Sequence, residues 1–319
     1  MPKFLIMKMI SIVLFFSLLP SINQPNEEMK AKPALDIKAQ LGEGALWDYK
    51  NNRLLWIDIE QGILHVFDPK TGKNESFEQG MRIGTVVPID TGGFVVALED
   101  GVYTFDPVAG KKIKRAAPPE LNPGIRFNDG KCDPSGRFWA GTMSLKNEPN
   151  AGALYRFDGD FSFKKMIDRV SISNGIVWSK DKKRMYYIDT PTRKVTAYDY
   201  DDATGHISNG KTTIEIPAGM GSPDGSVLDA EGMLWIGMWG GGCVTRWNPE
   251  TGELLQKIDI PALNVTSCAF GGEGLETLYV TTASIGMPEE KKKTYPDAGK
   301  LFALKPGVKG IPASYFKVR

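Results

Sequence analysis

The chain has 319 residues, of which 41% are hydrophobic, and this length suits one large domain or two small ones. Its 39 basic and 38 acidic residues leave a net charge of +1. Because these charges are spread along the sequence, they predict no basic surface for nucleic acid, and we expect no nucleic-acid partner.

The N-terminal residues form a segment of a different kind. After Lys3 and Lys8, an apolar run covers residues 9–19, and a polar stretch follows. A basic start with about a dozen apolar residues is typical of a secretory signal peptide and is short for a membrane span, which needs about 20. Residues 1–23 are therefore predicted to be a signal peptide or membrane leader that exports the protein to the periplasm or the exterior. The expected cleavage site is poor, so an uncleaved N-terminal anchor is the alternative.

One short pattern returns along the rest of the chain. A polar residue is followed five positions later by Asp, Ser or Gly, then by a turn and an apolar strand, as in "EGALWDYKNNRLLWID". Another strand and a tight turn follow each copy, as in "HVFDPKTG", where Pro restricts φ and Gly accepts a positive φ. The polar residues that open the copies, at spacings of 42, 43, 46, 50 and 42 residues, are Glu43, Thr85, Asn128, Asn174, Asp224 and Thr266.

The predicted elements are strands throughout. β-Branched and aromatic residues alternate with polar ones, and Gly or Pro interrupts them about every 8 to 12 residues. A repeat of about 40 to 50 residues that holds four strands is typical of a propeller, whereas a sandwich or barrel gives no reason for the longer period. We therefore predict an all-β fold, a single six-bladed β-propeller over residues 34–319 with a central metal-binding channel. A strand near residues 34–40 would close the ring by pairing with the last blade.

The opening residues of the six copies are expected to meet at the centre of this propeller. The innermost strand of each blade lines the channel, so equivalent positions face one another across the axis. Two carboxylates and two carboxamides in a narrow channel would need a cation between them, because burying an unpaired carboxylate is costly. Oxygen ligands favour Ca²⁺, with Zn²⁺, Mn²⁺ or Mg²⁺ able to substitute. Asx turns would explain any single Asn or Asp here, but not Glu43 in the same register.

Histidine and cysteine restrict the chemistry further. The two histidines are His65, inside a predicted strand, and His206, in a turn, which excludes a His-rich metal site and argues against a Ser-His-Asp triad. Cys132, Cys243 and Cys268 lie far apart in apolar segments without metal-like spacing. We expect them to be buried free thiols.

Several motifs now suggest a family. The segments "LGEGALWD", "RFNDGKCDPSGRFWAGTM", "ISNGIVWS" with "YYIDT", "PDGSVLDAEGMLWIGMWGGG" and "TSCAFGG" resemble, in this order, motifs of the regucalcin, senescence marker protein and gluconolactonase family of six-bladed propeller lactonases. The resemblance covers essentially residues 34–319. It implies that Glu43, Asn174 and Asp224 hold a divalent cation. It also implies that Arg126 and Asn128 contact a small-molecule lactone substrate in the channel mouth.

The reaction that fits these residues is hydrolysis of the cyclic ester of a sugar lactone, gluconolactonase-like, with the cation polarising the carbonyl while a water attacks. Asp224 is the expected catalytic base, because a carboxylate at the cation can reach that water and no histidine is available. Two alternatives stay open. One is an esterase or lactonase for more apolar lactones or aryl esters, and the other is a non-catalytic binding module braced by the metal.

Four residues near the expected site carry weaker expectations. After "AGTM", relatives often carry an acidic residue that touches substrate hydroxyls, whereas this chain has "SLKNEPN" with Lys146, so the lactone is not identified. Asp129 either caps its loop or serves as an auxiliary base. Trp235 and Trp239 are expected in the core of a blade rather than as a platform for a sugar ring.

Overall fold

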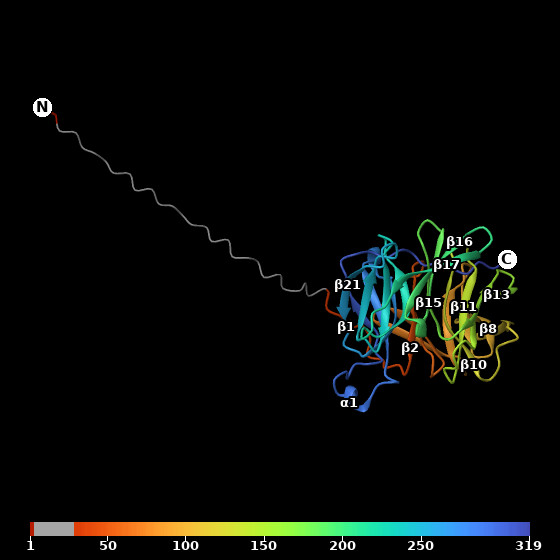
Figure 1. Cartoon of the computed structure of the whole chain (residues 1–319). Coiled ribbons are helices and arrows are strands. Elements are labelled where there is room, and N and C mark those ends of the chain that lie inside the picture. Colours follow the sequence, from red (N-terminus) through yellow and green to blue (C-terminus); the bar gives the residue numbers. More distant parts are fainter. Residues whose placement is uncertain (3–28) are drawn as a thin grey trace.

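The computed structural model describes residues 1–2 and 29–319, and its strands form six four-stranded antiparallel sheets (Figure 1). The sheets are the blades of a six-bladed β-propeller, which confirms the predicted fold class. Helix is scarce in the part of the chain that is described. It includes α1 (Glu289–Lys292) and the 3₁₀ turns η2 (Thr190–Thr192) and η3 (Glu273–Leu275).

Each blade takes its strands from one copy of the sequence repeat. Blade 1 consists of β2 (Gly42–Asp48), β3 (Arg53–Asp58), β4 (Ile63–Asp68) and β5 (Lys73–Glu78). Blade 2 consists of β6 (Ile83–Pro88), β7 (Phe94–Leu98), β8 (Gly101–Asp106) and β9 (Lys111–Ala116). Blade 3 consists of β10 (Ile125–Cys132), β11 (Phe138–Ser144), β12 (Gly152–Phe157) and β13 (Phe163–Val170).

The second half of the ring repeats this arrangement. Blade 4 consists of β14 (Ser173–Trp178), β15 (Arg184–Asp189), β16 (Lys194–Asp201) and β17 (His206–Glu215). Blade 5 consists of β18 (Ser222–Leu228), β19 (Leu234–Trp239), β20 (Cys243–Trp247) and β21 (Leu254–Asp259). Blade 6 consists of β22 (Asn264–Gly271), β23 (Thr277–Ala283), β24 (Phe302–Leu304) and β1 (Lys32–Pro33).

Blade 6 closes the ring with the strand β1 from the N-terminal side. β1 pairs antiparallel with β24 as the outermost strand of the blade. Closure by an N-terminal strand was expected, but the strand covers Lys32–Pro33 and not residues 34–40. Those residues run beside the last blade, where Ala34 and Ala39 donate backbone hydrogen bonds to Leu301 and Gly299. The pairing ends early because the chain must leave the outer edge here and cross to the innermost strand β2.

Burial decreases from the inner to the outer strands. In blade 1, every residue of β3 except Arg53 is buried, whereas β5 has only exposed and half-buried residues. Trp139 and Trp235 are fully buried and pack in clusters that join neighbouring blades. Each blade therefore stabilises the ring by burying its faces against its neighbours. Trp235 is a core residue, as expected, whereas Trp239 is only half-buried.

The three cysteines behave as the sequence predicts. Cys132, Cys243 and Cys268 are buried and free. His65 is buried in the first blade, where its Nδ1 lies 2.9 Å from Ser76 Oγ, and His206 is exposed on β17. Both histidines are therefore far from the inner strands that line the channel.

The last residues of the chain form a strap across one end of the channel. This C-terminal strap, residues 309–317, contacts the turns that follow the inner strands. The backbone hydrogen bonds that attach it run from Gly310 to Leu275, from Ala230 to Lys309, from Phe316 to Pro88 and from Lys317 to Gly136. In addition, the hydroxyl of Tyr315 donates to Asp48. The strap thereby joins blades 1, 2, 3, 5 and 6 at the end of the channel where the inner strands terminate.

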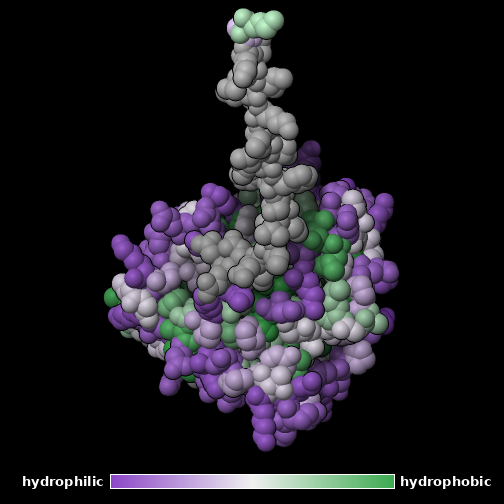
Figure 2. Space-filling model, turned by 90° about the vertical axis from the view of Figure 1, so that its left-hand side faces the viewer, coloured by the Kyte–Doolittle hydropathy of each residue, from purple (hydrophilic) through white to green (hydrophobic). Residues whose placement is uncertain are grey.

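The opposite end of the channel carries the loop with α1. Figure 1 shows α1 on the lower side of the propeller, while the chain reaches its C-terminus at the upper right. On the face shown in Figure 2, hydrophilic residues predominate and the apolar residues lie between them in separate patches. Within the described residues, no helix is long and apolar enough to cross a membrane. Nearly all of the predicted leader, residues 1–23, lies outside the described residues, so export stays a prediction.

The strap provides a test of this architecture. Phe316 is fully buried and packs against Phe161, with 4.9 Å between the ring centroids. Phe316→Ala should lower the free energy of unfolding by about 3–5 kcal/mol, because it leaves a cavity under the propeller. Val318→Ala, at an exposed position, should change it by less than about 0.5 kcal/mol. Denaturant-induced unfolding measures both values, and a small effect of Phe316→Ala would show that the strap contributes little.

Candidate functional site

A β-bulge occurs in all six inner strands, at or beside the residue that opens each sequence copy. The pairing of β2 with β3, for example, shifts register between Glu43 and Leu46, and that of β18 with β19 shifts between Pro223 and Ser226. The other four inner strands shift at the equivalent place. A bulge adds a residue to one strand and redirects its side chain. The repeated bulge is therefore the local feature that orients these polar side chains.

Three of the predicted site residues are joined by hydrogen bonds. Arg126 Nη1 donates to Asn128 Oδ1 at 2.6 Å, and Asn128 Nδ2 donates to Asn174 Oδ1 at 2.8 Å. Asn128 Nδ2 also donates to the carbonyl of Ser173 at 2.8 Å. The structure thus brings the inner strands of blades 3 and 4 together through the side chains that the sequence assigned to substrate and metal.

The chain of hydrogen bonds continues to a residue that the sequence analysis did not single out. Asn174 Nδ2 donates to Thr190 Oγ1 at 2.7 Å, and Thr190 Oγ1 donates to the carbonyl of Pro223 at 2.8 Å. Thr190 begins the turn η2 after β15, and Pro223 precedes Asp224. Thr190 therefore connects the predicted ligand of blade 4 to the backbone beside the predicted ligand of blade 5. Thr190 is the last residue of the motif "YYIDT", but neither the repeat nor its spacing predicts that the hydroxyl connects two blades.

Glu43 and Asp224 are buried carboxyl groups, with 7% and 5% of their surface exposed. Glu43 Oε2 accepts a hydrogen bond from the Gly44 amide at 3.1 Å, whereas Asp224 Oδ1 is buried without a partner. Burial, followed by repulsion from Asp129, raises the pKa of Glu43 to about 8. Burial, followed by repulsion from Glu43, raises the pKa of Asp224 well above its usual value. These two carboxyl groups are therefore close enough for their charges to interact.

The two threonines of the predicted ring have a different role. Thr85 Oγ1 donates to the carbonyl of Gly130 at 2.8 Å, and Thr266 Oγ1 donates to the carbonyl of Gly42 at 2.5 Å. Each hydroxyl thus ties its inner strand to the inner strand of the next blade. The expectation that all six polar residues face one another across the axis is wrong for Thr85 and Thr266, because their hydroxyls are directed at neighbouring backbone.

Arg126 is a buried cation with unused donors. Only 6% of its surface is exposed, and burial lowers the pKa of its guanidinium. Its Nη1 donates to Asn128 and to the carbonyl of Phe127. No carboxylate among the described residues lies within ion-pair distance of it. A guanidinium has five N–H donors, so Arg126 can bind further oxygen atoms in the channel.

Asp129 has one paired oxygen and one free oxygen. Its Oδ1 accepts a hydrogen bond from the Gly130 amide at 2.7 Å, as loop capping requires, while Oδ2 is buried without a partner. Burial raises the pKa of Asp129. Its second expected role, that of an auxiliary base, stays a prediction.

The loops at the α1 end supply the surroundings of the channel mouth. Lys146 is exposed, and its backbone amide donates to Ser144 Oγ at 3.1 Å. The Ser144 hydroxyl in turn lies 3.4 Å from Glu148 Oε2, so the acidic residue of this loop folds back on the strand end. A β-carbon on Gly286 would meet the Trp239 ring at 2.8 Å, which places the loop that carries α1 directly against Trp239.

The donor set restricts which cation the channel could hold. In the described part of the chain, no group of three or more His, Cys, Asp or Glu side chains is placed to bind a metal ion. A cation at Glu43 and Asp224 would thus depend on amide and water oxygens for its other ligands, a combination that Ca²⁺ accepts. The unpartnered oxygen of Asp224 and the mutual repulsion of the two carboxyl groups fit such an ion.

Thr190 offers a test of the hydrogen-bond chain. Thr190→Val keeps the shape of the side chain but leaves Asn174 Nδ2 without its acceptor and Pro223 without its donor. We expect the free energy of unfolding to fall by about 1–3 kcal/mol. Thr192→Val, in the same turn at an exposed position, removes the hydrogen bond to the Asp189 carbonyl and the long one from the Lys194 amide, and should cost less than about 1 kcal/mol because water can replace both. Equal losses in both variants would contradict a special role for Thr190.

Comparisons with known proteins agree with this geometry. The sequence matches the family described as SMP-30/Gluconolactonase/LRE-like region over residues 41–284. It is 39% identical over 275 residues to the Bacillus subtilis protein named "Putative sugar lactone lactonase YvrE", and the match covers 86% of this chain and 94% of that protein. It is 40% identical over 287 residues to regucalcin of Danio rerio, with coverage of 89% and 97%.

A solved structure extends the likeness to three dimensions. Regucalcin from Agrobacterium tumefaciens, described as a calcium-binding protein, matches with a TM-score of 0.85 at 28% identity. The match covers 89% of this chain and 96% of that one. With the sequence motifs, the six-bladed fold and these relatives in agreement, the chain belongs to the SMP-30/gluconolactonase/LRE-like family.

Proposed function

We propose that the protein is a divalent-cation-dependent lactonase that opens the cyclic ester of a sugar lactone. Its family is named for gluconolactonase, and a relative is named as a sugar lactone lactonase, which supports a lactonase function. The dependence on a cation is inferred from one observation. The carboxyl groups of Glu43 and Asp224 are buried and repel each other, and Asp224 Oδ1 has no hydrogen-bond partner.

The residues of the channel fit a divalent cation. Glu43 and Asp224 would supply carboxylate oxygens, and Asn174 would supply its amide oxygen, which Thr190 orients from the opposite side of the amide group. A calcium-binding relative supports Ca²⁺ as the cation, and Zn²⁺, Mn²⁺ and Mg²⁺ accept oxygen ligands as well. When bound, a cation of this kind polarises a carbonyl oxygen and lowers the pKa of a bound water.

Arg126 and Asn128 would orient the substrate. The free donors of Arg126 can bind the ring and hydroxyl oxygens of a lactone, and the Asn128 amide keeps the guanidinium in position through the hydrogen bond at 2.6 Å. Because Arg126 is buried, its hydrogen bonds to substrate form with little competition from water. The site is therefore suited to a substrate that is rich in oxygen atoms.

Asp224 is the carboxylate that we assign as the base. Water attacks the carbonyl carbon of the lactone, its proton passes to Asp224, and the bond between that carbon and the ring oxygen breaks. The ring oxygen leaves as a hydroxyl after it takes a proton, and the product is a hydroxy acid. Burial and the charge of Glu43 raise the pKa of the Asp224 carboxyl, and a positive charge in the channel would favour the ionised form that a base requires.

Export by residues 1–23 is part of this proposal. An exported lactonase would meet its substrate outside the cytoplasm. Comparison of the mature N-terminus with the encoded sequence tests the leader, because cleavage near residue 23 removes it and the anchored alternative retains it.

Activity measurements test the cation and the base together. Chelator-treated protein should lose hydrolysis of gluconolactone and regain it with added Ca²⁺, Mn²⁺ or Zn²⁺. Asp224→Asn should lower kcat by at least about 100-fold, because the base is lost. Asp259→Asn, an identical change at an exposed position on β21, is the control and should leave kcat unchanged. Full activity of Asp224→Asn would remove Asp224 from the reaction, and full activity in chelator would remove the cation.

Thermal unfolding at two pH values tests the cation without reference to activity. The pKa of Glu43 rises from 4.5 to about 8 on folding, so the stability of the metal-free protein should fall as the pH increases between these values. Ca²⁺ binds the ionised carboxylates, and the increase in Tm that it produces should therefore be larger at pH 8.5 than at pH 6. Glu43→Gln should reduce this pH dependence, while the raised pKa values of Asp224 and Asp129 should leave part of it. A Ca²⁺ effect that is equal at both pH values would contradict binding at Glu43.

A panel of substrates separates sugar lactones from the alternatives. Turnover should be highest for gluconolactone and related sugar lactones, and Arg126→Lys should raise KM because a single ammonium replaces the fork of donors. A preference for acyl-homoserine or aromatic lactones would favour a hydrolase of apolar esters. Binding of the cation without turnover of any lactone would favour a non-catalytic module.

A further inference from the structure

A cavity lies at the opposite end of the channel from the predicted site. It measures about 370 Å³, which is within the usual range for small-molecule sites. Its walls come from the ends of the inner strands β2, β10, β14, β18 and β22, beyond the bulges, and from residues 311–314 of the C-terminal strap. We call it the floor pocket. Its position beneath the strap separates it from the channel mouth, where Arg126 and Asn128 lie.

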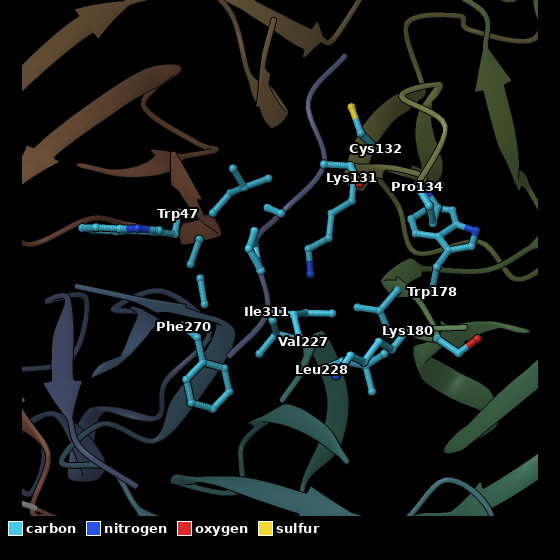
Figure 3. A pocket seen from close by; sticks show the side chains of 18 of the residues that line it. Trp47, Lys131, Cys132, Pro134, Trp178, Lys180, Val227, Leu228, Phe270 and Ile311 are labelled. Carbon is cyan, nitrogen blue, oxygen red and sulfur yellow. The ribbon is translucent and has the colours of Figure 1, made fainter. Parts of the chain in front are cut away.

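The lining of the floor pocket is largely apolar. It includes the rings of Trp47, Trp178 and Phe270, together with the aliphatic side chains of Leu228 and Ile311 (Figure 3). Such a surface favours a ligand with an apolar body, because contact removes apolar area from water on both partners.

The charges of the floor pocket all have one sign. Three lysines line it, Lys131, Lys180 and Lys182, and no acidic side chain does. Lys182 pairs with Asp202 at 3.2 Å, whereas no carboxylate among the described residues lies within ion-pair distance of Lys131 or Lys180. An anionic group on the ligand would therefore meet complementary charge in the pocket lining, whereas the carboxyl groups of Asp129 and Glu43, whose charges interact with Lys131, lie outside that lining.

Lys131 is the lysine that enters the pocket most directly. Figure 3 shows its side chain extending from β10 into the pocket, toward Ile311 and Val227. The ammonium donates to the carbonyl of Ser226, which uses one of its three N–H donors. The remaining donors can serve a carboxylate that enters from the side of the strap.

We propose that the floor pocket binds a small amphipathic monocarboxylate, with its apolar chain or ring against Trp47, Trp178 and Phe270 and its carboxylate on Lys131. A carboxylate on a half-buried ammonium gains a charge-assisted hydrogen bond, and the apolar body gains burial. This inference does not rest on the lactonase proposal, because it uses neither the carboxyl pair at the centre of the channel nor Arg126.

Calorimetric titration of the full chain with octanoate tests the proposal, with chelator present so that no cation at Glu43 and Asp224 can hold the ligand. Octanoate should bind, while octanol and octylammonium should bind at least tenfold more weakly. Arg126→Ala should retain binding, since this change affects only the other end of the channel. Lys164→Met, which removes an exposed lysine on β13, should also retain it.

Two variants of the floor pocket complete the experiment. Lys131→Met removes the charge but keeps most of the apolar stem, and Ala313→Trp fills the pocket from the strap. Each should weaken octanoate binding at least tenfold in protein whose thermal unfolding remains cooperative, and Ala313→Trp alone decides the matter if Lys131→Met does not fold. The proposal is overturned if octanoate does not bind, if octanol binds equally well, if Arg126→Ala abolishes binding, or if Ala313→Trp leaves binding unchanged.

Discussion

The burial of two acidic side chains at the centre of the propeller is the constraint on which the site depends. Glu43 and Asp224 come from blades 1 and 5, far apart in the sequence, and each raises the cost of ionising the other. Without a positive charge between them, both carboxyl groups favour the protonated form, and one oxygen of Asp224 stays without a partner. Burying such a pair is costly, and buried carboxyl groups with raised pKa values are common at binding and catalytic sites.

The rest of the channel supports this pair from several sides. The bulges of the inner strands direct the polar side chains, and the hydrogen bonds from Arg126 through Asn128 and Asn174 to Thr190 hold the amide groups in position. Groups that orient ligands in this way tune the affinity of metal sites. The strap closes the far end of the channel and leaves a separate pocket of opposite charge beneath it. One channel thus has an acidic centre and a basic, apolar floor.

The sequence predicts the parts of this arrangement that repeat. The repeat of four strands predicts the six blades. Because Glu43, Asn174 and Asp224 occupy the same position in their repeats, the sequence also predicts that all three lie on inner strands. It does not predict where a hydroxyl points, so Thr85 and Thr266 were grouped with the ring although each binds neighbouring backbone. Thr190 and Lys131 have no counterpart in a repeat, and their roles depend on contacts between blades. The path of residues 309–317 likewise depends on turns from five blades.

We propose that Glu43, Asp224 and Asn174 share one cation. Crystals grown with Mn²⁺ would test it most directly, because the anomalous signal of manganese locates the ion without reference to the surrounding atoms. We predict a single strong peak in the channel within coordination distance of oxygens from all three side chains. A channel without a peak, or a peak bound only to surface carboxylates, would contradict the claim.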